Sequence, residues 1–272
     1  MPCERDQLAL NDGCEEIALG GSREASRRLY RSHYALAFSI DGGISSSSLS
    51  KRCADGRASD TWQKLDRTTA LALGSLSDKI WTIAEILLFH HAQGQTSGFL
   101  AFADELRDAG HIVYSPDLYA GKTFANLDEG VGYAKQVGFD TIAERGRLSA
   151  DGLPQALVYA GFSLGVMPAQ MLAQTRPGAK GALFFSAAFP ASEFGVPWPA
   201  HVPLQIHMME DDEWALEDLP SARELTETVH DAALYLYPGD RHLFADSSLP
   251  DFDEDAATLL TQRVLEFLMA IG

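Results

Sequence analysis

The stretch Ala156-Leu157-Val158-Tyr159-Ala160-Gly161-Phe162-Ser163-Leu164-Gly165 carries the strongest structural signal in the chain. Its first five residues form an apolar run that is typical of a strand buried on both faces of a sheet, and a helical pattern follows over Leu164–Arg176. Between them lies Gly-x-Ser-x-Gly, the motif of a sharp turn that exposes a serine hydroxyl above a sheet. An isolated copy of this motif also occurs in ordinary turns, but the flanking strand and helix predict a nucleophile elbow with Ser163 at its tip.

Apolar runs and helical patterns alternate on both sides of this elbow. This alternation predicts right-handed crossovers and a parallel sheet, so we expect an α/β fold with a mostly parallel, doubly wound sheet flanked by helices. The expected strands are Ile83–Phe89, Ile112–Tyr114, Ala156–Ala160, Ala182–Phe185, Val202–Met208 and Ala233–Tyr237. The expected helices are Phe99–Leu106, Asp128–Arg147, Leu164–Arg176, Ala222–Val229 and Ala256–Ile271.

Two sequence pairs resemble the capping boxes that start helices. Ser221 with Glu224 has the spacing of a capping box, and Asn126 with Glu129 has a similar one. We therefore expect helices to begin at Ser221 and at Asn126.

The first 80 residues differ in character from the rest of the chain. They show no sustained helical or strand period, and they contain Gly20-Gly21-Ser22 and the run Ser45–Ser48. We expect residues 1–80 to be a flexible or loosely packed N-terminal extension and residues 81–272 to be the folded domain. The alternative is that this segment wraps the domain and that Ala70–Leu76 adds an edge strand.

The charge of the chain is unevenly divided. Residues 1–82 hold 11 Lys/Arg and 11 Asp/Glu, whereas residues 83–272 hold 10 and 27, so the net charge of −17 falls on the second part. Such a negative field repels phosphate backbones, which argues against a nucleic-acid partner.

The sequence shows neither a membrane span, nor a signal peptide, nor a cysteine motif. The chain has no apolar run long enough to span a bilayer, and its N-terminus lacks the pattern of a signal peptide, so we expect a cytoplasmic protein with no membrane partner. Three cysteines form neither a closed disulfide set nor a zinc motif. The sequence does not indicate an oligomeric state.

Partners for the serine follow later in the chain. A serine hydroxyl needs a base to take its proton and a carboxylate to orient that base. The strand Val202–Met208 ends in Glu210-Asp211-Asp212-Glu213, and the last strand ends in a turn that carries His242. Both follow the carboxyl ends of strands, the edge where open α/β sheets bind ligands. We expect a triad of Ser163, Asp212 and His242, with Asp211 as the alternative acid.

Other histidines allow competing interpretations. His90 and His91 follow the first expected strand, where the loop can supply a second oxyanion N–H. A paired-histidine metal site is the rival interpretation, but it lacks a third ligand, so we expect neither metal nor cofactor. His207 lies near the acid loop and is expected to pack there or to orient the acid.

Several segments together resemble the dienelactone hydrolase family of the α/β-hydrolase superfamily. They are Leu87–Gly94, Ala109–His111, Ser115–Tyr119, the Gly161–Gly165 elbow, the His207–Asp212 spacing and Tyr237–His242, within residues 83–272. The resemblance implies the triad above, with Asp212 favoured over Asp211, and an oxyanion hole formed by the N–H groups of Leu164 and Ala92.

The chain departs from that family pattern at two positions. The best-known members have cysteine where this chain has Ser163, and a glutamate that controls the thiol proton at about the position of His91. Because a serine needs no such glutamate, the two differences are mutually consistent. They disfavour dienelactone itself as the substrate.

The substrate pocket is assigned by position. We expect Phe189 and Trp198, in the loop 186–200, to form a pocket wall; the alternative is that this loop is a rigid surface connection. We expect His91 and Tyr119 to contact substrate, with Asp117 and Lys122 as further polar candidates. The resulting hypothesis is a serine hydrolase that cleaves small esters or lactones through an acyl-enzyme. The alternatives are a non-catalytic binding domain, a thioesterase or acyltransferase with the same triad, and a peptidase.

Overall fold

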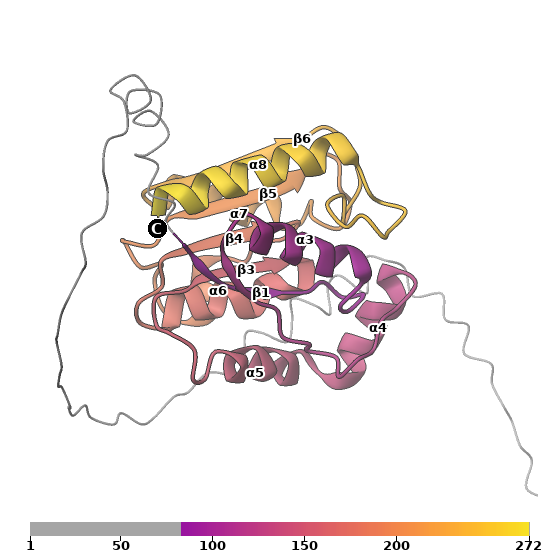
Figure 1. The fold of residues 1–272 in the computed structure, drawn as a ribbon, viewed down its shortest axis with the longest axis horizontal. Helices are drawn as coiled ribbons and strands as arrows, with labels where there is room; N and C mark the ends of the chain where they lie inside the picture. Colours follow the sequence, from indigo (N-terminus) through magenta and orange to yellow (C-terminus); the bar gives the residue numbers. More distant parts are fainter. Residues whose placement is uncertain (1–82, 272) are drawn as a thin grey trace, which may run out of the picture.

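A six-stranded parallel sheet forms the centre of the protein in a computed structural model that describes residues 83–271 (Figure 1). The strand order is β2-β1-β3-β4-β5-β6, and every neighbouring pair is parallel. This confirms the parallel, doubly wound α/β architecture, and each expected strand is present with ends shifted by no more than two residues. The strands are β1 (Glu85–Phe89), β2 (Ile112–Tyr114), β3 (Val158–Phe162), β4 (Gly181–Phe185), β5 (Leu204–Met209) and β6 (Ala232–Tyr237).

Helices connect the strands and cover both faces of the sheet, as Figure 1 shows. Two short 3₁₀ helices also occur within residues 83–271, one at the elbow and one in the loop after β4. The α-helices are α3 (Ser97–Asp108), α4 (Leu127–Val137), α5 (Phe139–Ser149), α6 (Val166–Thr175), α7 (Leu219–Thr228) and α8 (Glu254–Ile271), and the 3₁₀ helices are η2 (Ser163–Gly165) and η3 (Ala191–Phe194).

The alternation of side chains along each strand divides the core into two layers. In β1, Leu87 and Phe89 face the layer formed with α4, α5, α6 and α7. Ile86 and Leu88 face the opposite layer, which is formed with α3 and α8. All four side chains are fully buried. Both faces of the strand are therefore apolar, which explains why its sequence is a continuous apolar run rather than an alternating one.

Two expectations about helix boundaries were wrong. The helix expected over Asp128–Arg147 is interrupted at Gly138, whose φ of 90° is not helical, so α4 and α5 are separate. Helix α7 begins at Leu219 with a proline in its first turn, which places Ser221 inside the helix and not at its cap. The cap at Asn126 is confirmed, because its side chain accepts a hydrogen bond from the Glu129 N–H.

All six strands are parallel, so the loops that follow them leave from one edge of the sheet. The carboxyl ends of β1, β3, β4, β5 and β6 lead into the segments that begin at His90, Ser163, Ser186, Glu210 and Pro238. In an open parallel sheet this edge is where ligands bind, and the strand order reverses between β1 and β3.

The N-terminal extension and the absence of a membrane span were also expected from the sequence. The extension over residues 1–80 and its alternative edge strand lie outside the described residues. Within residues 83–271, no helix combines the length and the apolar character required to cross a membrane.

Candidate active site

Ser163 occupies a strained turn between β3 and α6. Its φ is 48°, a left-handed conformation that is uncommon for a residue with a side chain. The flanking glycines are required by close packing: a Cβ at Gly161 would lie 2.2 Å from the Gly165 carbonyl oxygen, and one at Gly165 would lie 2.5 Å from the Phe89 oxygen. The elbow therefore packs directly against the end of β1.

Ser163, His242 and Asp212 form one chain of hydrogen bonds. The Ser163 hydroxyl lies 2.7 Å from His242 Nε2, and His242 Nδ1 lies 2.6 Å from Asp212 Oδ2. Asp212 is 1% exposed, whereas Asp211 is exposed and its backbone N–H bonds to the Gly239 carbonyl. Because the carboxylate accepts from Nδ1, Nε2 is left as the acceptor for the serine proton. The structure thus brings together the three expected triad residues, and Asp212 is the acid that contacts the histidine.

Two residues that sequence reasoning missed hold the hydrogen-bonded triad in place. Ser186, at the end of β4, has a φ of 62° and donates its hydroxyl to the His242 carbonyl oxygen. The Trp214 N–H donates to Asp212 Oδ1 at 2.9 Å, so both oxygens of this carboxylate are occupied. The position of Ser186, directly after a strand at the ligand-binding edge, was an available signal for its role.

The two expected oxyanion donors lie on segments that touch. Leu164 is in the first turn of η2, where a backbone N–H has no partner within the helix. The Ala92 N–H has no acceptor among residues 83–271. Because Gly165 packs on the carbonyl groups of Phe89 and His90, the elbow and the loop that carries Ala92 are neighbours. This arrangement fits a pair of donors for a developing oxyanion.

Gly130 provides a test of how closely the Ala92 loop must be placed. A Cβ at this position in α4 would lie 2.1 Å from the Ala92 carbonyl oxygen, so Gly130→Ala must displace the loop or the helix. We expect kcat/KM for an ester to fall on the order of 10²-fold, the usual cost of a small misplacement of a catalytic group.

Gly132→Ala is the matched control for this prediction. Gly132 is exposed on the same helix, and no atom lies within 4 Å of its added Cβ. Its alanine variant should keep full activity and gain about 0.4–1 kcal/mol of stability. Steady-state rates and melting curves of both variants measure these effects on activity and stability. Equal activity in the two variants would show that the loop tolerates displacement.

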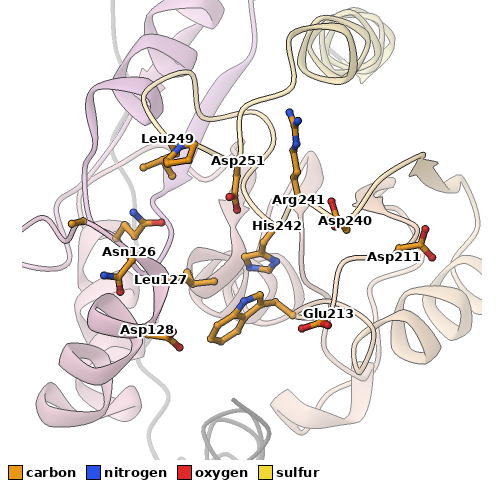
Figure 2. A pocket seen from close by; sticks show the side chains of 14 residues that line it. Asn126, Leu127, Asp128, Asp211, Glu213, Asp240, Arg241, His242, Leu249 and Asp251 are labelled. Atoms are coloured by element: carbon orange, nitrogen blue, oxygen red, sulfur yellow. The ribbon is translucent and has the colours of Figure 1, made fainter. Parts of the chain in front are cut away.

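A cleft of about 590 Å³ opens beside His242. Figure 2 shows the histidine between Leu127 on one side and Glu213 on the other. The indole of Trp214 lies 6.1 Å from the imidazole, measured between ring centroids. The lining residues come from the loops after β1, β2, β5 and β6 and from the start of α4: Gln93, Ala125, Asn126, Leu127, Asp128, Asp211, Glu213, Trp214, Asp240, Arg241, His242, Leu249, Pro250 and Asp251.

None of the four residues expected to bind substrate lines this cleft. His91 and Tyr119 are no more than 1% exposed. His91 bonds to Asp246, and Tyr119 donates its hydroxyl to the Gly130 carbonyl in α4. Phe189 is buried in the core, and Trp198 packs on Phe184 and donates its indole N–H to the Val202 carbonyl. His91, Tyr119 and Phe189 follow the carboxyl ends of strands but turn into the core, because burying an aromatic ring stabilises the fold. Trp198 lies instead near the amino end of β5, since the carbonyl that it bonds to precedes Leu204, the first residue of that strand.

The further polar candidates also point elsewhere. Asp117 accepts hydrogen bonds from the N–H groups of Tyr119 and Gly121, so it shapes its own loop. The Lys122 ammonium lies 4.4 Å from the centre of the Tyr133 ring. Neither residue is among those that line the cleft.

The remaining histidines make separate hydrogen bonds. His90 Nδ1 lies 2.7 Å from the His91 carbonyl oxygen, and its Nε2 accepts the Leu118 N–H at 3.0 Å. His207 bonds to the Tyr237 hydroxyl at 2.8 Å and to Gln205, and it stacks on tyrosines of β6. His207 therefore packs within the sheet and does not contact the Asp212 carboxylate.

The burial of His90 and His207 predicts a loss of stability at acid pH. Burial lowers the pKa of His90 to about 4 and that of His207 to about 3. The unfolded chain takes up these protons near pH 6.5, so it binds more protons than the folded protein below that pH. We expect the free energy of unfolding to fall between pH 6.5 and 5, by about 1.4 kcal/mol per pH unit for each fully buried histidine.

Urea unfolding at a series of pH values measures this slope. His207→Gln should reduce this slope, because it removes one of the two buried imidazoles named above; His230→Gln, which removes an exposed imidazole, is the control. A free energy of unfolding that stays constant over this range would contradict the prediction.

A comparison with protein families places residues 75–272 in the dienelactone hydrolase family. The match covers most of the chain and begins before residue 81, where the domain was expected to start. It includes every residue of the site described above. No curated protein matches the chain.

Solved structures similar to this protein share its fold at low sequence identity. A dienelactone hydrolase-like promiscuous phosphotriesterase from metagenomic libraries is 16% identical, with a TM-score of 0.55 over 69% of this chain and 86% of the other. A putative dienelactone hydrolase from Klebsiella pneumoniae is 15% identical, with a TM-score of 0.54 over 71% and 89%. A dienelactone hydrolase from Anabaena variabilis is 18% identical, with a TM-score of 0.51 over 70% and 87%. The chain has the α/β-hydrolase fold and belongs to the dienelactone hydrolase family.

Proposed function

We propose that this protein, a carboxylic ester hydrolase by its family membership, cleaves esters or lactones of small molecules through an acyl-enzyme on Ser163. The observation that carries the proposal is the hydrogen-bonded chain of Ser163, His242 and Asp212, with His242 lining a cleft at the ligand-binding edge of the sheet. A serine, a neutral imidazole and a buried carboxylate in this order are the parts needed for acyl transfer.

The geometry supports a two-step reaction. His242 Nε2 takes the Ser163 proton as Oγ attacks the ester carbonyl, and Asp212 stabilises the imidazolium that forms. The N–H groups of Leu164 and Ala92 stabilise the oxyanion, and the imidazolium returns its proton to the departing alcohol. Water then attacks the acyl-enzyme, with His242 again as the base, and releases the carboxylic acid.

Hydrolysis of p-nitrophenyl acetate tests this proposal most directly. A working triad should release p-nitrophenol and should be labelled by a fluorophosphonate at Ser163, as seen by mass spectrometry of the modified peptide. A non-catalytic binding domain would do neither. Thioesterase or acyltransferase activity would appear as faster turnover of a matched thioester, or as transfer to an added alcohol in preference to water.

The charge of the cleft predicts which esters react fastest. Five carboxylates line it, whereas Arg241 is the one lysine or arginine among the described lining residues. The Arg241 guanidinium is directed to the Phe252 carbonyl at 2.5 Å and to Asp253 at 3.5 Å. We therefore expect cationic and neutral esters to react faster than anionic ones, because the cleft repels negative charge.

Three acyl chains of similar size measure this preference: one ends in trimethylammonium, one in tert-butyl and one in carboxylate. At low salt, kcat/KM for the cationic ester should exceed that for the anionic ester by about tenfold or more, and the ratio should shrink as ionic strength rises. A preference for the carboxylate would contradict this prediction.

A further inference from the structure

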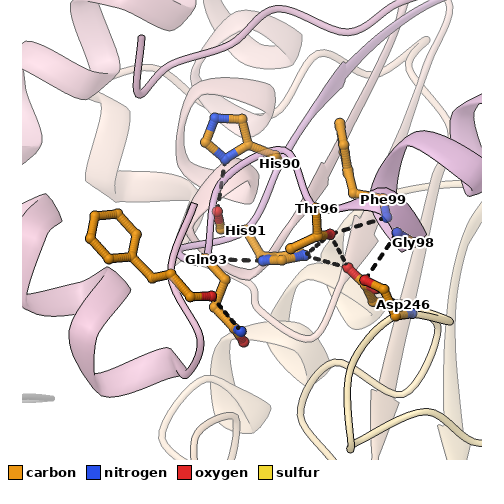
Figure 3. A network of polar contacts seen from close by, with 9 residues as sticks. His90, His91, Gln93, Thr96, Gly98, Phe99 and Asp246 are labelled. Atoms are coloured by element: carbon orange, nitrogen blue, oxygen red, sulfur yellow. Dashed lines mark hydrogen bonds and ion pairs between the residues drawn. The ribbon is translucent and has the colours of Figure 1, made fainter. Parts of the chain in front are cut away.

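His91 and Asp246 form a buried pair beside the proposed active site. His91 Nε2 lies 2.8 Å from Asp246 Oδ2, and the two residues are 1% and 3% exposed (Figure 3). On the other side of the ring, Nδ1 accepts the Gln93 N–H at 3.2 Å. The imidazole is therefore bonded at both nitrogens and closed off from the cleft.

These bonds determine the protonation of the pair. Because Nδ1 accepts a backbone N–H, the ring proton is on Nε2 and is donated to the carboxylate. The Asp246 carboxylate also accepts the Thr96 hydroxyl, and the Ser248 hydroxyl at 2.7 Å. Burial by itself would raise the pKa of Asp246, but the hydrogen bonds from His91, Thr96 and Ser248, together with the electrostatic attraction of His91, lower it to about 2. The carboxylate is thus ionised and accepts the Nε2–H of His91.

The pair connects two loops that are far apart in sequence. His91 is next to Ala92, and its ring holds the N–H of Gln93, the residue that follows Ala92. Asp246 lies four residues after His242 in the loop after β6. The connection thus runs from the loop of the oxyanion donor to the loop of the base, across 155 positions of sequence.

The surrounding chain is built to admit this carboxylate. Thr96 caps α3 by accepting the Phe99 N–H and also donates to Asp246, so the helix start and the carboxylate are joined. A Cβ at Gly98 would lie 1.9 Å from Asp246 Oδ1, and the Gly98 N–H donates to Ser248. The carboxylate is therefore held on several sides in one position.

We propose that His91 and Asp246 are positioning residues that hold the Ala92 N–H at a constant place relative to His242. This inference rests on the proposed function, since it concerns the oxyanion donor of that reaction. Neither residue contacts the reacting atoms; both act through the backbone of their loops. Loss of the pair should weaken stabilisation of the transition state more than binding of the ester, so kcat should fall while KM changes little.

The test compares His91→Leu with His111→Leu. His111 is also buried and also accepts a backbone N–H on Nδ1 at 3.2 Å, from Ala84, but it lies at the opposite end of β1. It is a matched control for losing a buried imidazole near this strand. His91→Gln is the second variant, because it keeps a donor for Asp246 and loses the acceptor for the Gln93 N–H; it protects the test if His91→Leu fails to fold.

For the His91 variants we expect kcat to fall on the order of 10²-fold with KM within about threefold of wild type. Amides of residues 90–96 should also exchange hydrogen faster than in wild type. His111→Leu should lower the melting temperature and leave both kcat and the exchange of these amides unchanged. Equal kcat in the His91 and His111 variants, or a loss that only follows the melting temperature, would overturn the inference.

Hydrogen exchange separates this inference from the proposed function. A wild-type protein that neither hydrolyses p-nitrophenyl acetate nor reacts with a fluorophosphonate would refute the proposed function. Exchange at residues 90–96 is measured without turnover. Faster exchange in the His91 variants supports the pair as the element that holds this loop, and unchanged exchange overturns that role.

Discussion

Replacing Ser163 by alanine is expected to lower kcat/KM for p-nitrophenyl acetate on the order of 10⁴-fold or more. In the proposed mechanism the variant loses the oxygen that forms the acyl-enzyme, and water must then attack without covalent catalysis. The fold should remain intact, because the removed hydroxyl is bonded to His242 and supports no backbone group. Alanine at a φ of 48° meets the same conformational cost as serine, so the strain of the turn should not change appreciably.

Melting curves and fluorophosphonate labelling accompany the rate measurement. The variant should melt near the wild-type temperature and should not be labelled. Ser192→Ala, at an exposed position of η3 that does not line the cleft, is the matched control and should behave as wild type. Retention of more than a tenth of the activity by Ser163→Ala would remove Ser163 as the nucleophile.

Asp212→Asn should be the next most damaging substitution, with a loss approaching 10⁴-fold, the cost seen for the equivalent change in a serine protease triad. An asparagine amide that faces His242 donates to Nδ1, which moves the ring proton to Nε2 and blocks acceptance from Ser163. The backbone bond from the Trp214 N–H can persist with an asparagine oxygen, so the loop should keep its shape. The activity is therefore lost because His242 takes the wrong tautomer and the negative charge of Asp212 is removed.

Asp211→Asn is the matched control for this change, since it is the same substitution one residue away. Asp211 is exposed and its side chain lines the cleft without contacting His242, so activity toward a neutral ester should change by less than about threefold. The substrate must be a neutral ester, because Asp211 lines the cleft and the loss of its charge would change the rate for a charged ester. The reverse order of effects would assign the acid to Asp211.

Secondary structure was predictable where apolar runs were long or strongly periodic. All six strands lie where their runs indicated, because a strand buried on both faces must be apolar throughout. Boundaries were less certain. Gly138 divides one expected helix because its positive φ interrupts the helical backbone, and a glycine in a helical pattern does not reveal its own dihedral angle.

The order of serine, acid and histidine along the chain was sufficient to name three residues that the fold brings into one hydrogen-bonded chain. Each lies in the turn or loop that follows a strand, and parallel strands bring their carboxyl ends to one edge. The choice between Asp211 and Asp212 from spacing alone remained open, because both follow β5. The conformation of the loop decides which carboxylate is buried against the imidazole.

The sequence by itself determined the fold class, the elbow and the edge of the sheet where the chemistry gathers, because periodicity and local turn geometry depend on near neighbours in the chain. Only the tertiary structure decided which loop side chains face the cleft and which enter the core. His91, Tyr119 and Phe189 follow strand ends at the correct edge, yet they turn inward to buried partners, one of them 155 residues away, and Trp198 packs near the amino end of β5. The direction of a loop side chain depends on the partners that the folded chain places around it, and those contacts join residues that sequence spacing cannot relate.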